Sequence, residues 1–376
     1  QQHKDSLGLA DEAQLQVYFT KRIEDFLLQN GRRLMGWDEI MEGGNLSSTA
    51  GVMVWRGENL AREATQAGHP VVIAHNYYFD LYQGNPLYEP VTYGYLPLER
   101  VYRYNPVPAG FSDEQQRRVL GVEGCLWTEN VYDTRKAEYM IFPRLFALAE
   151  VAWSPAERLD WPDFQRRLPA LFDWLDRRDT HYATSVYDPE IVVTVDSASR
   201  QLSAQIRQQI PHGTVRYSVD GIPPGIDATE YTRPIPLSAP CTLQARAFWG
   251  THRFSKIISV PFRPSMASGK PFALRALPDK RYNGEHPEVL TDGLDGAEAF
   301  HDGRWCGFYG DDFGLTIDLG AVQPLHRLEM HWLEVEGSWI YLPLFMSVES
   351  SDDGLNWTPV AQLTKAEIAA KAAGRI

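Results

Sequence analysis

Four short, almost wholly apolar segments alternate with helical patterns before residue 160. The apolar segments, which we interpret as strands, are 32–37, 51–55, 69–75 and 119–127. Helices are expected between and after them, at 11–30 (with Asp11 as its N-cap), 58–67, 112–118 and 136–153. Strands of a parallel sheet are covered on both faces and therefore read as continuous apolar runs, so this alternation predicts parallel βα units.

Two α/β folds fit four such strands. A doubly wound sheet of this size would be complete in itself. A (β/α)8 TIM-type barrel needs eight strands and ~250 residues, so this region would be half of one. The long 76–112 connection leaves the carboxyl end of the third strand, where the functional loops of a barrel lie, and so favours the barrel.

Three of the strands end on a tryptophan, at Trp37, Trp55 and Trp127. Barrel active sites lie at the carboxyl ends of the strands, so a group of indoles there favours the barrel. Indoles in such a place predict a pocket for a ligand with flat apolar faces and polar edges, and a pyranose sugar has this form.

After residue 190 the pattern changes to short alternating strands separated by Gly, Pro and Ser turns. We expect an all-β sandwich over 191–265 and a second all-β domain over 266–376, with strands including LHRLEMHWLE at 325–334. The chain ends in a helical AEIAAKAAGRI with no closing strand, so the last domain is expected to be truncated.

Charge and composition exclude several function classes. The net charge of −13 argues against binding nucleic acid, because an acidic chain repels polyphosphate. No apolar run reaches the ~18–20 residues of a membrane span, and the first residues lack the pattern of a signal peptide. The three cysteines form neither a disulfide framework nor a zinc pattern, and no Gly-rich phosphate loop is present, so no metal or cofactor is expected.

Carboxylates follow the strand ends at Asp38–Glu39, Asp80 and Glu129. Paired carboxylates at a barrel mouth are typical of glycoside hydrolysis, although any one of them is more often a helix cap or an ion-pair partner. Asp38 and Glu39 are adjacent, so both side chains converge only if the chain bends there. Tyr78 can donate a hydrogen bond to charge that develops on a substrate, with core packing as its alternative role.

Several segments resemble the second half of the catalytic barrel of glycoside hydrolase family 20, the β-N-acetylhexosaminidases. The resemblance covers residues 1–190 and rests on GRRLMGWDEIMEGG, VMVWRG, YYFDLYQ, GVEGCLWTENV and EYMIFPRLFALAEVAWS. Within 191–265, TVRYSVDGIPP and TLQARAF are similar to the small chitobiase-type C-terminal β domain. Within 266–376, LTDGLDGAEAFHDGRWCGF and SDDGLNW resemble a discoidin-like (coagulation factor 5/8 C-type) domain.

The resemblance implies roles for six residues. Trp37, Trp55 and Trp127 correspond to the walls around the terminal N-acetylhexosamine, and Tyr78 to the catalytic tyrosine that hydrogen-bonds the acetamido carbonyl. Asp80 and Glu129 correspond to acidic residues that bind the O4 and O6 hydroxyls. Asp38–Glu39 do not match the family's acid/base pair, which lies in a His-x-Gly-Gly-Asp-Glu motif that is found nowhere in this sequence.

The function implied is a retaining exo-β-N-acetylhexosaminidase acting by substrate-assisted catalysis through an oxazolinium intermediate. This chain would be a fragment without the acid/base pair, inactive alone and dependent on the missing N-terminal half of the barrel. Its substrates would be glycans with terminal GlcNAc or GalNAc, and its location periplasmic or extracellular. The alternative is a non-catalytic carbohydrate-binding protein or pseudoenzyme. In that case Trp305, Trp332 and Trp339 are candidates for a binding surface, although core packing is the more common role for each of them.

Overall fold

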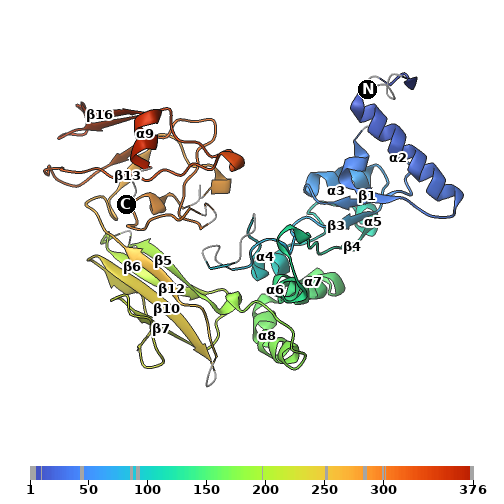
Figure 1. The fold of residues 1–376 in the computed structure, drawn as a ribbon, viewed down its shortest axis with the longest axis horizontal. Coiled ribbons are helices and arrows are strands. Elements are labelled where there is room, and N and C mark those ends of the chain that lie inside the picture. Colours follow the sequence, from blue (N-terminus) through green and yellow to red (C-terminus); the bar gives the residue numbers. More distant parts are fainter. Residues whose placement is uncertain are drawn as a thin grey trace. The chain divides into compact units, whose positions relative to one another are not determined.

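The computed structural model divides the chain into two compact units (Figure 1). The first unit comprises residues 1–85 and 89–186, and the second comprises residues 86–88 and 187–376. The residues that the structure describes are 6–9, 11–42, 46–84, 88–89, 94–196, 198–249, 253–282, 286–298, 300 and 302–372. The first unit is mixed α/β, and the second consists mainly of β-strands.

A four-stranded parallel sheet forms the centre of the first unit, with its strands in chain order. The strands are β1 (Met35–Trp37), β2 (Gly51–Val54), β3 (Val71–Ile73) and β4 (Val119–Val122). All four predicted strands are therefore present, each shorter than its apolar run. The two central strands are largely buried, whereas the edge strands expose the apolar side chains of Met35 and Leu120.

The predicted helices that precede β4 are confirmed. They are α2 (Glu12–Gln29), α3 (Glu58–Gln66) and α5 (Asp113–Arg118), and a further helix, α4 (Leu98–Arg103), lies in the long connection. The Asp11 side chain caps α2 by accepting from the backbone N–H of Gln14 at 2.9 Å. Helix α3 packs against β2 and β3, and α5 packs against β4.

The helix expected over 136–153 is two helices, α6 (Thr134–Ile141) and α7 (Arg144–Trp153). The interruption falls at Phe142–Pro143, because proline has no N–H to donate and the residue before it avoids the helical conformation. Helix α7 packs against β4 and against α4.

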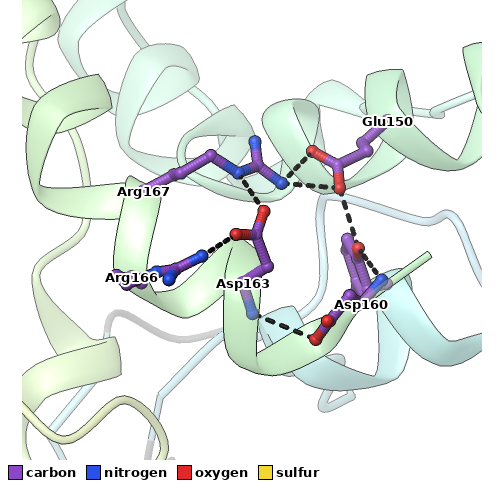
Figure 2. Close-up of polar contacts among 6 residues, drawn as sticks. Glu150, Asp160, Asp163, Arg166 and Arg167 are labelled. Atoms are coloured by element: carbon purple, nitrogen blue, oxygen red, sulfur yellow. Dashed lines mark hydrogen bonds and ion pairs between the residues drawn. The ribbon is translucent and has the colours of Figure 1, made fainter. Parts of the chain in front are cut away.

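Helix α8 (Trp161–Asp176), which the sequence analysis missed, is joined to α4 and α7 by a network of charges (Figure 2). Arg167 donates to both carboxylate oxygens of Glu150 at 2.8 Å and to Asp163 at 2.6 Å. The Tyr102 hydroxyl also donates to Glu150, at 2.8 Å, so one carboxylate links three helices.

The second unit begins with two antiparallel sheets. One has the order β5-β6-β9, and in the other β10 pairs with β7, β11 and β12, while β8 pairs with β7. Apolar side chains of both sheets form one core cluster, which includes Ile191, Ile206 and Phe262. The strands are β5 (Pro189–Val195), β6 (Leu202–Gln208), β7 (Thr214–Ser218), β8 (Thr229–Glu230), β9 (Ile235–Leu237), β10 (Cys241–Trp249), β11 (Arg253–Phe254) and β12 (Ile258–Phe262).

Beyond residue 270 the strands form two separate pairs. β13 (Phe272–Leu274) pairs with β14 (Leu315–Ile317), and β15 (Phe345–Ser350) pairs with β16 (Thr358–Thr364), which α9 (Lys365–Ala372) follows. The strand expected at 325–334 is not formed. Most of its side chains are exposed, and none of the strands in the described part of the chain supplies the hydrogen-bond partners that a strand there requires.

Among the helices that the structure describes, none combines the length and the apolar character needed to cross a membrane.

The charge network predicts the effect of removing its central carboxylate. Glu150→Ala should lower the free energy of unfolding by about 1–2 kcal/mol, because Arg167 and Tyr102 both lose their acceptor. The measurement is the shift of the urea denaturation midpoint, with Glu157→Ala, an exposed carboxylate in η3 (Ala156–Arg158), as the control. Equal midpoints for the two variants would contradict this role of Glu150.

Candidate functional site

The parallel sheet brings the carboxyl ends of β1 to β4 to one edge. All six predicted site residues lie at or just beyond these ends. Trp37 is the last residue of β1 and Trp55 directly follows β2, while the segments after β3 and β4 carry Tyr78, Asp80, Trp127 and Glu129. The order of the strands therefore gathers residues that are far apart in the sequence.

Four aromatic rings make contact at this edge. The rings of Trp37 and Trp127 lie with centroids 6.0 Å apart at an interplanar angle of 39°, and those of Trp55 and Tyr78 lie 6.4 Å apart at 50°. A hydrogen bond joins the side chains of Tyr78 and Trp127, so the two pairs form one cluster. Trp55 and Trp127 remain 38% and 47% exposed, which leaves parts of both indoles available to a ligand.

Tyr78 is fixed by an extension of the sheet pairing. It forms a parallel bridge with Cys125, beyond the ends of β3 and β4, and the N–H of Phe79 donates to the Cys125 carbonyl at 2.6 Å. Burial raises the pKa of the Tyr78 phenol to about 12, and the neighbouring Cys125 thiol acts in the same direction. At neutral pH the Tyr78 hydroxyl is therefore protonated and able to donate a hydrogen bond.

The two acidic candidates occupy different environments. Asp80 is only 2% exposed and lies within electrostatic range of both Tyr78 and the buried Arg144. Glu129 is exposed, in the short 3₁₀ helix η2 (Thr128–Asn130) that directly follows Trp127. The candidate site thus has one buried carboxylate, that of Asp80, which we call the inner one, and one exposed carboxylate, that of Glu129, which we call the outer one.

Asp38 and Glu39 both hold Trp55 in place, by different atoms. The chain bends after β1 into the 3₁₀ helix η1 (Asp38–Met41). Fully buried Asp38 accepts from the backbone N–H groups of Trp55 at 2.9 Å and Arg56 at 3.0 Å, and from the Arg56 Nε at 2.5 Å. Glu39 accepts from the Trp55 indole Nε1 at 3.0 Å. Asp38 is thus occupied by structural contacts and is not placed as a proton donor.

Two arginines of this region escaped the sequence analysis. Arg56 was missed because its partner Asp38 follows another strand, and only the β1–β2 pairing brings them together. Arg144, which contacts the segment after Tyr78, carried a visible signal. It is a single cation at the start of the otherwise apolar stretch RLFALA.

Outside this edge, the tryptophans considered for a second binding surface differ in their surroundings. Trp305 donates its indole N–H to the Ala297 carbonyl at 2.7 Å, and Trp332 packs edge-to-face on Phe313 at 5.7 Å. Trp339 is 83% exposed. Within the described part of the chain, no group of three or more His, Cys, Asp or Glu side chains is placed to hold a metal ion.

Comparison with known proteins gives two family matches. Residues 1–156 match the catalytic domain of glycosyl hydrolase family 20, and residues 205–262 match the family described as Fn3 associated. The second match falls within the two antiparallel sheets that begin the second unit.

Two relatives agree with the first match by sequence, and one solved structure is also similar. A β-hexosaminidase of Porphyromonas gingivalis is 35% identical over 273 residues, which are 69% of this chain and 34% of that protein. A β-hexosaminidase of Vibrio furnissii is 34% identical over 147 residues, 38% of this chain and 24% of that protein. The crystal structure of an exo-β-N-acetylglucosaminidase from Vibrio harveyi in complex with N-acetylglucosamine aligns with a TM-score of 0.43 and 31% identity, over 48% of this chain and 29% of that one. The chain thus spans about a third or less of the length of each.

Asp38 and Glu42 both bind Arg56, but only Asp38 is fully buried. We therefore expect their substitutions to lower the free energy of unfolding by different amounts. Asp38→Asn should lower the free energy of unfolding by about 2 kcal/mol, because a fully buried partner of Arg56 loses its charge. Glu42→Gln, whose carboxylate is half exposed, should cost less than about 1 kcal/mol. Urea denaturation checks both values, and equal losses would show that burial does not decide the strength of these contacts.

Proposed function

Because residues 1–156 belong to glycosyl hydrolase family 20, we propose that the intact protein is a retaining exo-β-N-acetylhexosaminidase. It would remove terminal β-linked GlcNAc or GalNAc from glycans or glycoconjugates. The observation that carries this proposal is the aromatic cluster of Trp37, Trp55, Tyr78 and Trp127 at one edge of the sheet. The indoles supply apolar walls for the sugar and its acetamido methyl group.

The protonated Tyr78 hydroxyl suits a substrate-assisted reaction. In this reaction the acetamido oxygen of the substrate attacks the anomeric carbon and forms an oxazolinium intermediate, with retention of configuration. Tyr78 donates a hydrogen bond to the acetamido oxygen and fixes it for attack. Asp80 on the inner side and Glu129 on the outer side accept hydrogen bonds from the O4 and O6 hydroxyls of the sugar.

The reaction also requires a general acid and base, and the His-x-Gly-Gly-Asp-Glu motif that carries them in the family is absent from these 376 residues. We therefore assign the pair to a part of the (β/α)8 barrel outside this sequence, with residues 1–190 as its second half. Exposed apolar side chains support the proposal that residues 1–190 are only half of a barrel. The side chains of Met35 and Leu120 are exposed on the edge strands, and those of Phe19, Ile23 and Phe26 form an exposed row along α2.

In this proposal the remaining half of the barrel is the partner that covers these groups. Residues 191–265 and 266–376 are the two accessory β domains, of the chitobiase C-terminal type and the discoidin-like type. The proposed location, periplasmic or extracellular, rests on the habit of bacterial members of the family.

The division of the barrel predicts the activity of two forms of the protein. Residues 1–376 alone should not hydrolyse an aryl N-acetyl-β-glucosaminide, whereas the intact protein should, because only the intact protein has the acid/base pair. Release of the aryl alcohol reports the reaction. Full activity of residues 1–376 alone would refute the assignment of the pair, and an inactive intact protein that binds N-acetylglucosamine would favour a carbohydrate-binding protein.

Two substitutions in the intact protein test the wall and the tyrosine. Trp127→Ala should cost about 2–3 kcal/mol of substrate binding, a roughly 30- to 150-fold loss in kcat/KM. Tyr78→Phe should lower kcat about 100-fold, since it keeps the ring but removes the hydroxyl that donates to the acetamido oxygen. The control is Trp153→Ala, an exposed tryptophan at the end of α7, which should leave both constants unchanged. If Trp127→Ala behaves like this control, Trp127 is not a wall of the sugar site.

A further inference from the structure

One arginine connects the helices to the segment that follows Tyr78. Arg144, the first residue of α7, is completely buried, and its guanidinium donates to four backbone carbonyl oxygens. Nη1 lies 3.1 Å from the oxygen of Leu81 and 3.0 Å from that of Leu96. Nη2 lies 2.5 Å from the oxygens of Phe79 and Met140. The guanidinium therefore fixes three separate stretches of backbone at one point.

The positions of two of these acceptors bear on the site. The carbonyls of Phe79 and Leu81 flank Asp80, and Phe79 directly follows Tyr78. The guanidinium carbon also lies 5.1 Å from the centre of the Phe79 ring. Arg144 thus holds the backbone on both sides of Asp80 and immediately after Tyr78.

Burying the charged guanidinium of Arg144 costs free energy, because the charge loses its hydration. Burial lowers the pKa of Arg144 to about 9, against the opposing effect of Glu89 and Asp80, so the group stays charged at neutral pH. Desolvating a charge costs several kcal/mol, and well-packed apolar side chains commonly replace buried ionic groups without loss of stability. Stability alone is therefore a weak reason for a cation here, whereas the planar fork of N–H donors gives the carbonyls fixed positions.

We propose that Arg144 is a positioning residue for the reaction, holding the 79–81 backbone so that the Tyr78 hydroxyl and the Asp80 carboxylate meet the sugar. This inference rests on the proposed hydrolase function. A displacement of about 1 Å in a positioned group can lower the rate roughly 100-fold. Lysine keeps the charge but lacks the guanidinium fork, so it should not hold all four carbonyls.

The first test is a double-mutant cycle in the intact protein, with an aryl N-acetyl-β-glucosaminide as substrate. Arg144→Lys should lower kcat/KM roughly 100-fold. Its effect should be smaller in a Tyr78→Phe background, because one of the two groups that it positions is already removed, and the part that acts through Asp80 remains. In a Glu129→Gln background its effect should stay complete, since Glu129 lies in η2 and Arg144 holds the 79–81 segment. An effect of equal size in both backgrounds, or no effect of Arg144→Lys on kcat/KM, would overturn the proposal.

The second test needs no activity. Amide hydrogen exchange in peptides covering 78–82 should rise in Arg144→Lys, and in Arg144→Gln, which removes the charge but retains two N–H donors. Arg167→Lys is the matched control, because Arg167 is also an arginine that binds across helices. Its contacts join α4, α7 and α8 (Figure 2). This control should leave both exchange at 78–82 and kcat/KM unchanged.

The two tests separate the two hypotheses. If the intact protein does not hydrolyse the substrate, the proposed function fails, and exchange at 78–82 still decides whether Arg144 holds this segment. Unchanged exchange at 78–82 in whichever Arg144 variant folds would overturn the positioning role, even in a fully active enzyme.

Discussion

The candidate site depends on the parallel register of β1 to β4. Pairing aligns Trp37 with Met53 and Val54 with Ile73, so the strands end close to one line at their carboxyl ends. The Tyr78–Cys125 bridge continues the pairing past the ends of β3 and β4. A slip of one residue would turn the side chains of a strand to its other face and would disperse the aromatic cluster.

Two buried charged side chains, Asp38 and Arg144, fix this edge from different directions. Asp38 and Arg56 hold the backbone around Trp55 from within the sheet, and Arg144 holds the segment after Tyr78 from the helix α7. Apolar packing alone is tolerant of small shifts, whereas hydrogen bonds to charged groups have short, directed geometries. We therefore expect the side chains of Trp55 and Tyr78 to vary less in position than the exposed side chain of Glu129.

Much of the first unit was predictable because its signals are local. Each parallel strand appears as an apolar run, and Asp11 is a recognisable cap. The break at Pro143 was missed because the apolar pattern continues across it, and α8 was missed because Pro162 and Pro169 interrupt its pattern. Arg144 stands out in the sequence as a lone cation in an apolar stretch, but its contacts and those of Asp38 were not predictable, since their partners become neighbours only in the folded chain.

The central claim is that the aromatic cluster at the carboxyl edge binds the N-acetyl group of a terminal hexosamine. The most direct measurement is a crystal structure of the intact protein with N-acetylglucosamine. The account predicts the acetamido methyl against the indoles of Trp37, Trp55 and Trp127, with the Tyr78 hydroxyl about 2.7–2.8 Å from the acetamido oxygen. A sugar bound away from this edge, or one whose acetamido group turns away from Tyr78, would contradict it.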